Sequence, residues 1–154
     1  MTAQEGRFLV THADESSAVL KDVDRGQVHT LAENPGVEAG EVLEGTLEPE
    51  PPMEVTDRLT AVETRRRLTV EESPEPPTAQ ERELATAQSE GELTTEERAG
   101  TGEIHVLTVP ESRTEAAVEE VLEDEATLVR AARLGVDRVE VRSEAGVVSV
   151  RYLP

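Results

Sequence analysis

Apolar and polar residues alternate with a period of two through the first part of the chain, which is typical of β-strands. In Arg7–Ala13, for example, this alternation places Phe8, Val10 and His12 on one face. The expected strands are Arg7–Ala13, Ala18–Val23, Gln27–Ala32, Glu41–Leu47 and a fifth strand or bent pair within Met53–Val70. Five short antiparallel strands with glycine turns predict a small β-barrel-like lobe of the OB or SH3-like kind.

A proline-rich stretch, Ser73–Pro77, interrupts this pattern, because proline has no N–H to donate to a strand ladder. Thr78 and Glu81 have the spacing of a helix capping box, so a short helix is expected over Ala79–Gln88. Thr94–Ala99 is expected to add one more helical turn.

The C-terminal third predicts a strand, a helical region and a hairpin. The strand is Glu103–Val109, and the hairpin joins Val136–Arg142 to Val147–Leu153. Between them apolar residues recur at helical spacing, and Asp124 is placed to end a first helix and cap a second. Gly135 stands where a helix C-terminal glycine belongs. The pattern predicts a βαββ unit in which a helix covers one side of a three-stranded sheet.

These patterns divide the 154 residues into three parts. We expect a small β-barrel-like lobe at residues 1–72, a proline-rich linker with a short helix at 73–102, and a βαββ lobe at 103–154. The expected fold class is therefore α+β.

Charge adds a constraint on the surface. The chain has 34 acidic and 15 basic residues, a net charge of −19, and Lys21 as its single lysine. The net charge is −9 over residues 1–72, −5 over 73–102 and −5 over 103–154. This spread excludes an acidic tail and disfavours a DNA mimic, which usually has one charged face. Molar salt, with a Debye length of about 3 Å, screens such self-repulsion, so the composition predicts an acidic surface adapted to a halophilic environment.

The sequence also limits the compartment and the available chemistry. It contains no cysteine, which excludes disulfides, thiolate nucleophiles and zinc–cysteine sites. Its apolar runs are shorter than the roughly 20 residues of a membrane helix. The polar, acidic Met1–Gly6 is unlike a signal peptide. We therefore expect a cytoplasmic protein with no membrane partner.

The three histidines are the scarcest reactive groups. His12, His29 and His105 fall on three separate expected strands, each on a face with apolar neighbours. Three convergent histidines can hold Zn²⁺ with an open fourth position. Their spacing contains neither H-x-H nor H-x-x-x-H, and His105 belongs to the other lobe, so structural histidines are the preferred interpretation. We assign no metal site.

Catalytic motifs are weak. Ser16 or Ser17, His12 and Asp14 supply the residue types of a Ser/His/Asp triad, without the G-x-S-x-G nucleophile elbow. Carboxylate pairs occur by chance in so acidic a chain, and its G-x-G segment precedes a strand, the wrong order for a phosphate loop. We predict no catalytic residue and no cofactor, and rank a small metal-dependent or hydrolytic enzyme third among the functions.

Arg65, Arg66 and Arg67 form the only basic run. In a small barrel, such a run is suited to contacting nucleic-acid phosphates. Single-strand binders of this kind usually stack bases on aromatic rings, and the chain offers only Phe8 and Tyr152, both expected in cores. Pairing with the nearby Glu63, Glu71 and Glu72 at a solvated strand end is the preferred role. A second basic patch is expected on the exposed side of the hairpin: Arg138, Arg142 and Arg151.

Six stretches carry a resemblance to a known family: Phe8–Asp14, Gln27–Leu31, Asn34–Val37, Pro51–Val55, His105–Pro110 and Val148–Pro154. In them the chain resembles a haloarchaeal family of small acidic proteins that is known only as a domain of unknown function. The resemblance covers nearly the whole chain and implies a halophilic archaeal source. It implies no activity, cofactor or catalytic residue.

The leading hypothesis is thus a non-enzymatic binding or adaptor module that contacts another protein or associates with itself. The sheet edges of the C-terminal lobe are the expected surface, because unpaired strand edges invite pairing with another chain. The alternative is a nucleic-acid-binding protein that uses the β-barrel-like lobe and Arg65–Arg67.

Overall fold

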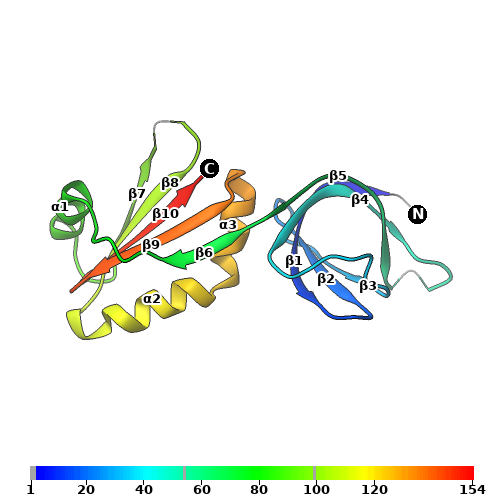
Figure 1. Ribbon diagram of the computed structural model, residues 1–154, viewed down its shortest axis with the longest axis horizontal. Helices are drawn as coiled ribbons and strands as arrows, with labels where there is room; N and C mark the ends of the chain where they lie inside the picture. Colours follow the sequence, from blue (N-terminus) through cyan, green and yellow to red (C-terminus); the bar gives the residue numbers. More distant parts are fainter. Residues whose placement is uncertain (1–2, 54, 99) are drawn as a thin grey trace. The chain divides into compact units, whose positions relative to one another are not determined.

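The computed structural model describes residues 3–53, 55–98 and 100–154. The chain folds into two compact units, Met1–Leu68 with Leu128–Arg133, and Thr69–Thr127 with Leu134–Pro154. The described residues form three α-helices and two mixed five-stranded sheets, which confirms the α+β class (Figure 1). Among these residues no helix is long and apolar enough to cross a membrane.

The first sheet closes on itself. Its strands are β1 (Gln4–Ala13), β2 (Ala18–Asp22), β3 (Val28–Leu31), β4 (Glu41–Pro49) and β5 (Asp57–Arg67). Pairing runs from β1 through β2, β3, β5 and β4 and returns to β1. All pairs are antiparallel except β3 with β5, which meet in parallel at Leu31 and Asp57. The expectation of a purely antiparallel lobe is wrong at this pair, because an odd number of strands cannot form a ring with every neighbour antiparallel.

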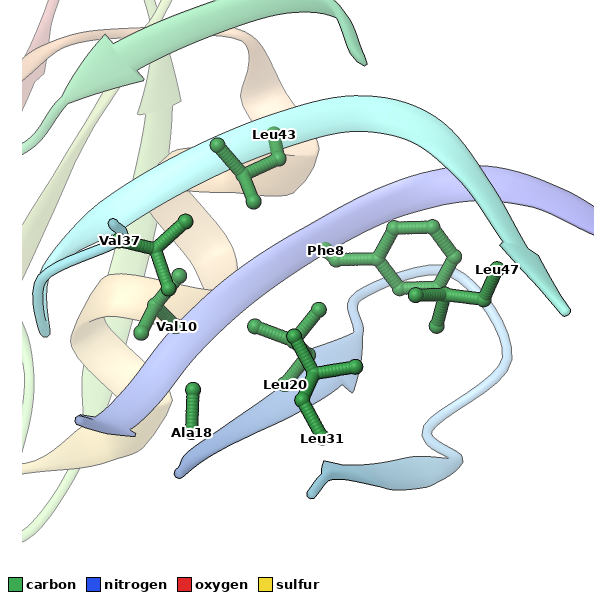
Figure 2. Close-up of a cluster of buried hydrophobic side chains, with 8 residues drawn as sticks. All are labelled: Phe8, Val10, Ala18, Leu20, Leu31, Val37, Leu43 and Leu47. Carbon is green, nitrogen blue, oxygen red and sulfur yellow. The ribbon is translucent and has the colours of Figure 1, made fainter. Parts of the chain in front are cut away.

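Alternation along these strands directs apolar side chains to the inside of the ring. Figure 2 shows the buried cluster, to which Val37 of the segment between β3 and β4 also contributes: Phe8, Val10, Ala18, Leu20, Leu31, Val37, Leu43 and Leu47. His12 was expected on the same face as Phe8 and Val10, but it is exposed. The register of β1 against β2 shifts between Val10 and His12, and this bulge ends the simple alternation.

The second sheet is open. Its strands are β6 (Thr69–Glu72), β7 (Leu93–Glu97), β8 (Glu103–Thr108), β9 (Arg138–Glu144) and β10 (Val147–Leu153). Their order is β6-β9-β10-β8-β7, with β6 parallel to β9 and the other pairs antiparallel. The helical elements are α1 (Ala79–Ala87), the 3-10 turn Glu111–Arg113, α2 (Thr114–Glu123) and α3 (Glu125–Leu134), of which Leu128–Arg133 groups with the first unit.

Along the hairpin of β9 and β10, the two faces of this sheet differ in chemistry. One face is apolar and buried, and α2 packs against its strands β9 and β10: Val139, Val141, Val148, Val150 and Tyr152. The opposite face carries Ser149 and Arg151, and α1 packs there against β8 and β10. The alternation expected for the hairpin is therefore confirmed.

Two expectations about this region are wrong. Thr94–Ala99 does not begin a helical turn, since residues 93–97 form β7 and Ala99 lies outside the described residues. Pairing with β8 supplies more main-chain hydrogen bonds than a single helical turn can. The C-terminal sheet also has five strands instead of three, because β6, from the end of the expected Met53–Val70 pair, joins it beside β9.

Three local signals are confirmed. Thr78 Oγ1 accepts the Glu81 N–H at 3.2 Å and Glu81 Oε1 accepts the Thr78 N–H at 3.0 Å, which is a complete capping box. Asp124 separates α2 from α3, and its Oδ1 accepts the Ala126 N–H at 2.9 Å. Gly135 follows α3 with a φ of 76°, a conformation that favours glycine.

Gly45 allows β4 and β5 to approach closely, which generates a stability prediction. A Cβ atom at this position would lie 2.2 Å from the carbonyl oxygen of Ala61, beside a register shift. We expect Gly45→Ala to lower the free energy of unfolding by about 1–3 kcal/mol, because the two main chains must move apart. Thermal unfolding followed by circular dichroism measures the effect, with Thr46→Ala on the same strand as the control. Equal losses in both variants would contradict the steric argument.

Candidate functional site

The basic run at the end of β5 is engaged within its own unit. Arg65 binds the carboxylate of Glu41 through Nε and through Nη2, the latter at 2.9 Å. Arg67 Nη1 lies 2.7 Å from Glu38 Oε2, in an ion pair whose members are both more than half exposed. Arg66 Nη2 donates to the carbonyl oxygen of Ala132 at 3.2 Å. Two of the three predicted phosphate contacts are thus ion-paired to glutamates.

Glu41 is the more enclosed of the two glutamates, with 7% of its side chain exposed, against 69% for Glu38. Hydrogen bonding from Arg65 lowers the pKa of Glu41, outweighing the opposing effect of burial. The Glu38 N–H donates to Glu41 Oε1 at 2.7 Å and favours the carboxylate as well. Arg65 therefore ties the end of β5 to the start of β4.

The histidines do not converge. His29 Nδ1 lies 3.0 Å from Asp57 Oδ2, and His105 Nε2 lies 2.9 Å from Glu103 Oε1. Both histidine side chains are 13% exposed, whereas His12 is exposed. No group of three or more potential ligands that could hold a metal ion occurs among the described residues. A carboxylate partner for each of the two enclosed rings agrees with a structural role.

Asp14, Ser16 and Ser17, which were considered for a Ser/His/Asp triad, form the turn between β1 and β2. Asp14 Oδ1 accepts the main-chain N–H groups of Ser16 and Ser17, each at 2.8 Å. Hydrogen bonds from Ser17 and Ser16 lower the pKa of Asp14. This carboxylate stabilises the turn, the usual role of an aspartate two residues before a bend.

A cavity of about 350 Å³ lies in the second unit between α1 and the polar face of the sheet. Glu81 and Leu84 of α1 line it, as do Glu96 of β7, Ile104 of β8 and Arg151 of β10. This volume is at the lower end of the range of ligand pockets, roughly 300–1,000 Å³. The cavity can accept a small molecule or one long side chain.

Arg151 is held inside the protein by two carboxylates. Its Nη1 lies 3.7 Å from Glu81 Oε2 and its Nε lies 3.9 Å from Glu140 Oε1. These two nitrogen atoms are buried and have no hydrogen-bond partner among the described residues. The expected exposed patch on this hairpin is wrong for Arg142 and Arg151, because α1 and the preceding segment cover them to 15% and 18% side-chain exposure.

β7, which lines the cavity, is also a border of the sheet, and no described strand pairs with its outer side. Its flanking residues face β8: the Thr108 N–H donates to the carbonyl of Glu92 at 3.1 Å, and the Arg98 N–H is 3.5 Å from the carbonyl of Gly102. Inward and outward main-chain groups alternate along an antiparallel strand. The residues whose N–H and C=O groups point outward are therefore Leu93, Thr95 and Glu97.

A model for a family of unknown function (DUF5812) matches residues 4–143. The chain belongs to this family. The DUF5812 match includes strands of both units, all of β7 and the part of the cavity formed by α1, whereas Arg151 lies beyond it. No curated protein and no solved structure matches the chain.

Sequence analysis missed the cavity and the open edge of β7, and the signal for both was weak. Leu93, Thr94 and Thr95 include two β-branched residues, which favour a strand, but the segment is too short for a clear period. The cavity itself joins segments that are far apart in the sequence, with α1 separated from β10 by some sixty residues. Only the order of the strands brings Glu96 and Arg151 to one face.

The Glu41–Arg65 pair predicts a stability that depends on pH. A carboxylate whose pKa is lowered in the folded state stabilises the fold above its unfolded pKa, about 4.3, and loses that contribution as the pH falls through the folded value. We expect Glu41→Gln to lower the free energy of unfolding by about 1–2 kcal/mol at pH 7. The difference in stability between this variant and the wild type should disappear as the pH falls.

Thermal unfolding between pH 7 and pH 2.5 tests this prediction. Glu38→Gln removes the same charge from an exposed pair and should cost much less. A gap between Glu41→Gln and the wild type that stays constant down to the lowest pH would contradict it.

Proposed function

We propose that the protein is a non-enzymatic binding module that holds another polypeptide by adding a strand to the outer edge of β7. The supporting observation is the open border itself, where the outward main-chain groups of Leu93, Thr95 and Glu97 have no strand partner among the described residues. Strand addition obtains its affinity from such groups, and its specificity from pockets for alternate side chains.

The opposite border of the same sheet is less suited to this role. β6 has only four residues, and its exposed Glu71 and Glu72 precede the proline-rich Ser73–Pro77. Short strands, charges and prolines are the devices with which proteins protect an edge. β7 also ends in two glutamates, but Leu93 at its start is 51% exposed and no proline follows the strand directly.

We also propose in which environment this module works. The net charge of −19, which is spread along the chain, and the small cores favour a halophilic, cytoplasmic protein of haloarchaeal source. The closed ring of the first unit favours a β-barrel-like lobe of OB or SH3-like kind at residues 1–72. The linker at 73–102 and a βαββ lobe at 103–154 complete this division, in which β6 and β7 extend the sheet of the last lobe.

Nucleic-acid binding through Arg65, Arg66 and Arg67 receives less support. Arg65 and Arg67 are ion-paired to Glu41 and Glu38, so a phosphate would have to compete with carboxylates already in place. Phe8 and Tyr152, the only candidates for base stacking, are buried. We therefore place strand addition first.

Salt adaptation predicts that the fold gains stability with ionic strength. The melting temperature should rise by several degrees between 0.1 M and 2 M KCl, because screening removes the repulsion within a chain of net charge −19. Circular dichroism melts measure it. A melting temperature that is flat or falls over this range would contradict the adaptation.

Strand addition predicts that one main-chain N–H on β7 is required for binding. We expect Thr95→Pro to abolish retention of protein partners from a lysate of the source organism kept at ~2 M KCl, treated with nuclease. The Thr95 N–H points outward, where an edge strand tolerates proline, so the fold should persist.

Glu72→Pro is the matched control, because the Thr69 and Ser73 N–H groups face β9 and that of Glu72 points outward on the other border. It should retain the same partners as the wild type. Equal retention by Thr95→Pro and the wild type, with unchanged melting temperatures, would refute strand addition at β7. Partners that disappear with nuclease treatment would favour nucleic-acid binding instead.

A further inference from the structure

We propose that the segment added to β7 is a basic extended peptide, whose arginine or lysine beside Glu96 enters the cavity under α1. This inference rests on the proposed strand addition and specifies the class of partner. It is drawn from the register of the sheet and from the charges that line the cavity.

The register decides which partner side chain reaches the cavity. Side chains of directly paired residues lie on the same face of a sheet, with Cβ atoms about 4.5–5.5 Å apart. Glu96 lines the cavity on the polar face and pairs with Ile104, which lines it too. A residue of an added strand placed opposite Glu96 therefore projects on the face of the cavity, whereas its two neighbours project to the other face.

The charges of the cavity favour a cation at that position. Neither arginine that lines it pairs with the carboxylates of β7: Arg151 lies at ion-pair distance from Glu81 and Glu140, and Arg98 Nη1 donates to the carbonyl oxygen of Thr101 at 2.7 Å. Glu96 and Glu97 form no ion pair with the described residues. The hydrogen bond from Gln80 Nε2 to Glu96 Oε2 is long, 3.4 Å.

The shape of the cavity agrees with a long basic side chain. Leu84 and Ile104 provide apolar surface next to these carboxylates. The methylene groups of arginine or lysine pack on apolar side chains while the charged end remains among polar groups. A cavity of about 350 Å³ has room for one such side chain.

A second copy of the chain fits this site less well. Antiparallel pairing of two β7 strands about Thr95 would place Thr94 opposite Glu96 and Leu93 opposite Glu97. Neither residue is basic, so the cavity would gain no cation. Each copy also carries a net charge of −19, which opposes association at the low KCl concentration of the test. We therefore commit to a basic peptide, with self-association as an outcome of the test.

The test uses the full chain and short labelled peptides of alternating threonine and valine that differ only in a central arginine, glutamine or glutamate. Binding is measured by fluorescence anisotropy at the lowest KCl concentration at which circular dichroism shows complete folding. We expect the arginine peptide to bind roughly tenfold more tightly than the glutamine peptide, and the glutamate peptide to bind most weakly.

Three variants separate the contributions. Glu96→Gln should remove most of the preference for arginine while retaining the glutamine peptide. Glu71→Gln, which removes the same charge from the same face at the opposite border of the sheet, should keep the preference. Thr95→Pro should abolish binding of all the peptides, because it removes a main-chain donor.

Each other outcome contradicts one part of the proposal. If all three peptides bind the wild type equally well and none binds Thr95→Pro, the basic partner is refuted and strand addition remains supported. If Glu96→Gln and Glu71→Gln weaken the preference for arginine equally, the preference reflects the overall charge of the protein, and the role of the cavity is refuted. Peptides that fail to bind would refute both proposals. If sedimentation shows a dimer that Thr95→Pro dissociates but the peptides do not, the segment added to β7 is that of a second copy of the chain.

Discussion

Main-chain hydrogen bonding between strands is completed within the first unit and left open at two borders in the second, and the proposed binding role depends on that difference. In the first unit the pairing returns from β4 to β1, so every strand has a neighbour on both sides. In the second unit the sheet ends at β6 and β7. An N–H or C=O group at an open border is satisfied by water or by another chain, and only the second choice provides affinity.

The small apolar cores set the conditions under which these sheets persist. The first core contains one aromatic ring, Phe8, among valine, leucine and alanine, and the second contains Tyr152 among valines. Such cores must outweigh the repulsion of a chain with 34 acidic residues. Ions screen that repulsion and many salts strengthen apolar burial, so both effects act in the same direction in concentrated salt.

The polar face of the second sheet shows how acidic and basic residues serve as internal structure. Glu81 caps α1 with one oxygen and lies at ion-pair distance from Arg151 with the other, and Glu140 balances both Arg151 and Arg142. These contacts hold α1 over the sheet and thereby create the cavity beside β7. The glutamates at the end of β7 form no ion pair with the described residues, and the proposed basic partner depends on this feature.

The sequence by itself determined the local elements: the strands of the first unit, the Thr78–Glu81 capping box, the division of the helical region at Asp124, and the faces of the C-terminal hairpin. It did so because alternation and capping depend on neighbours within a few residues. Only the tertiary structure decided that residues 93–97 form a strand, that the first sheet contains a parallel pair, and that Arg151 is enclosed. Each of these depends on hydrogen bonds or ion pairs between residues far apart in the chain, and no local pattern records which distant segment will be the partner.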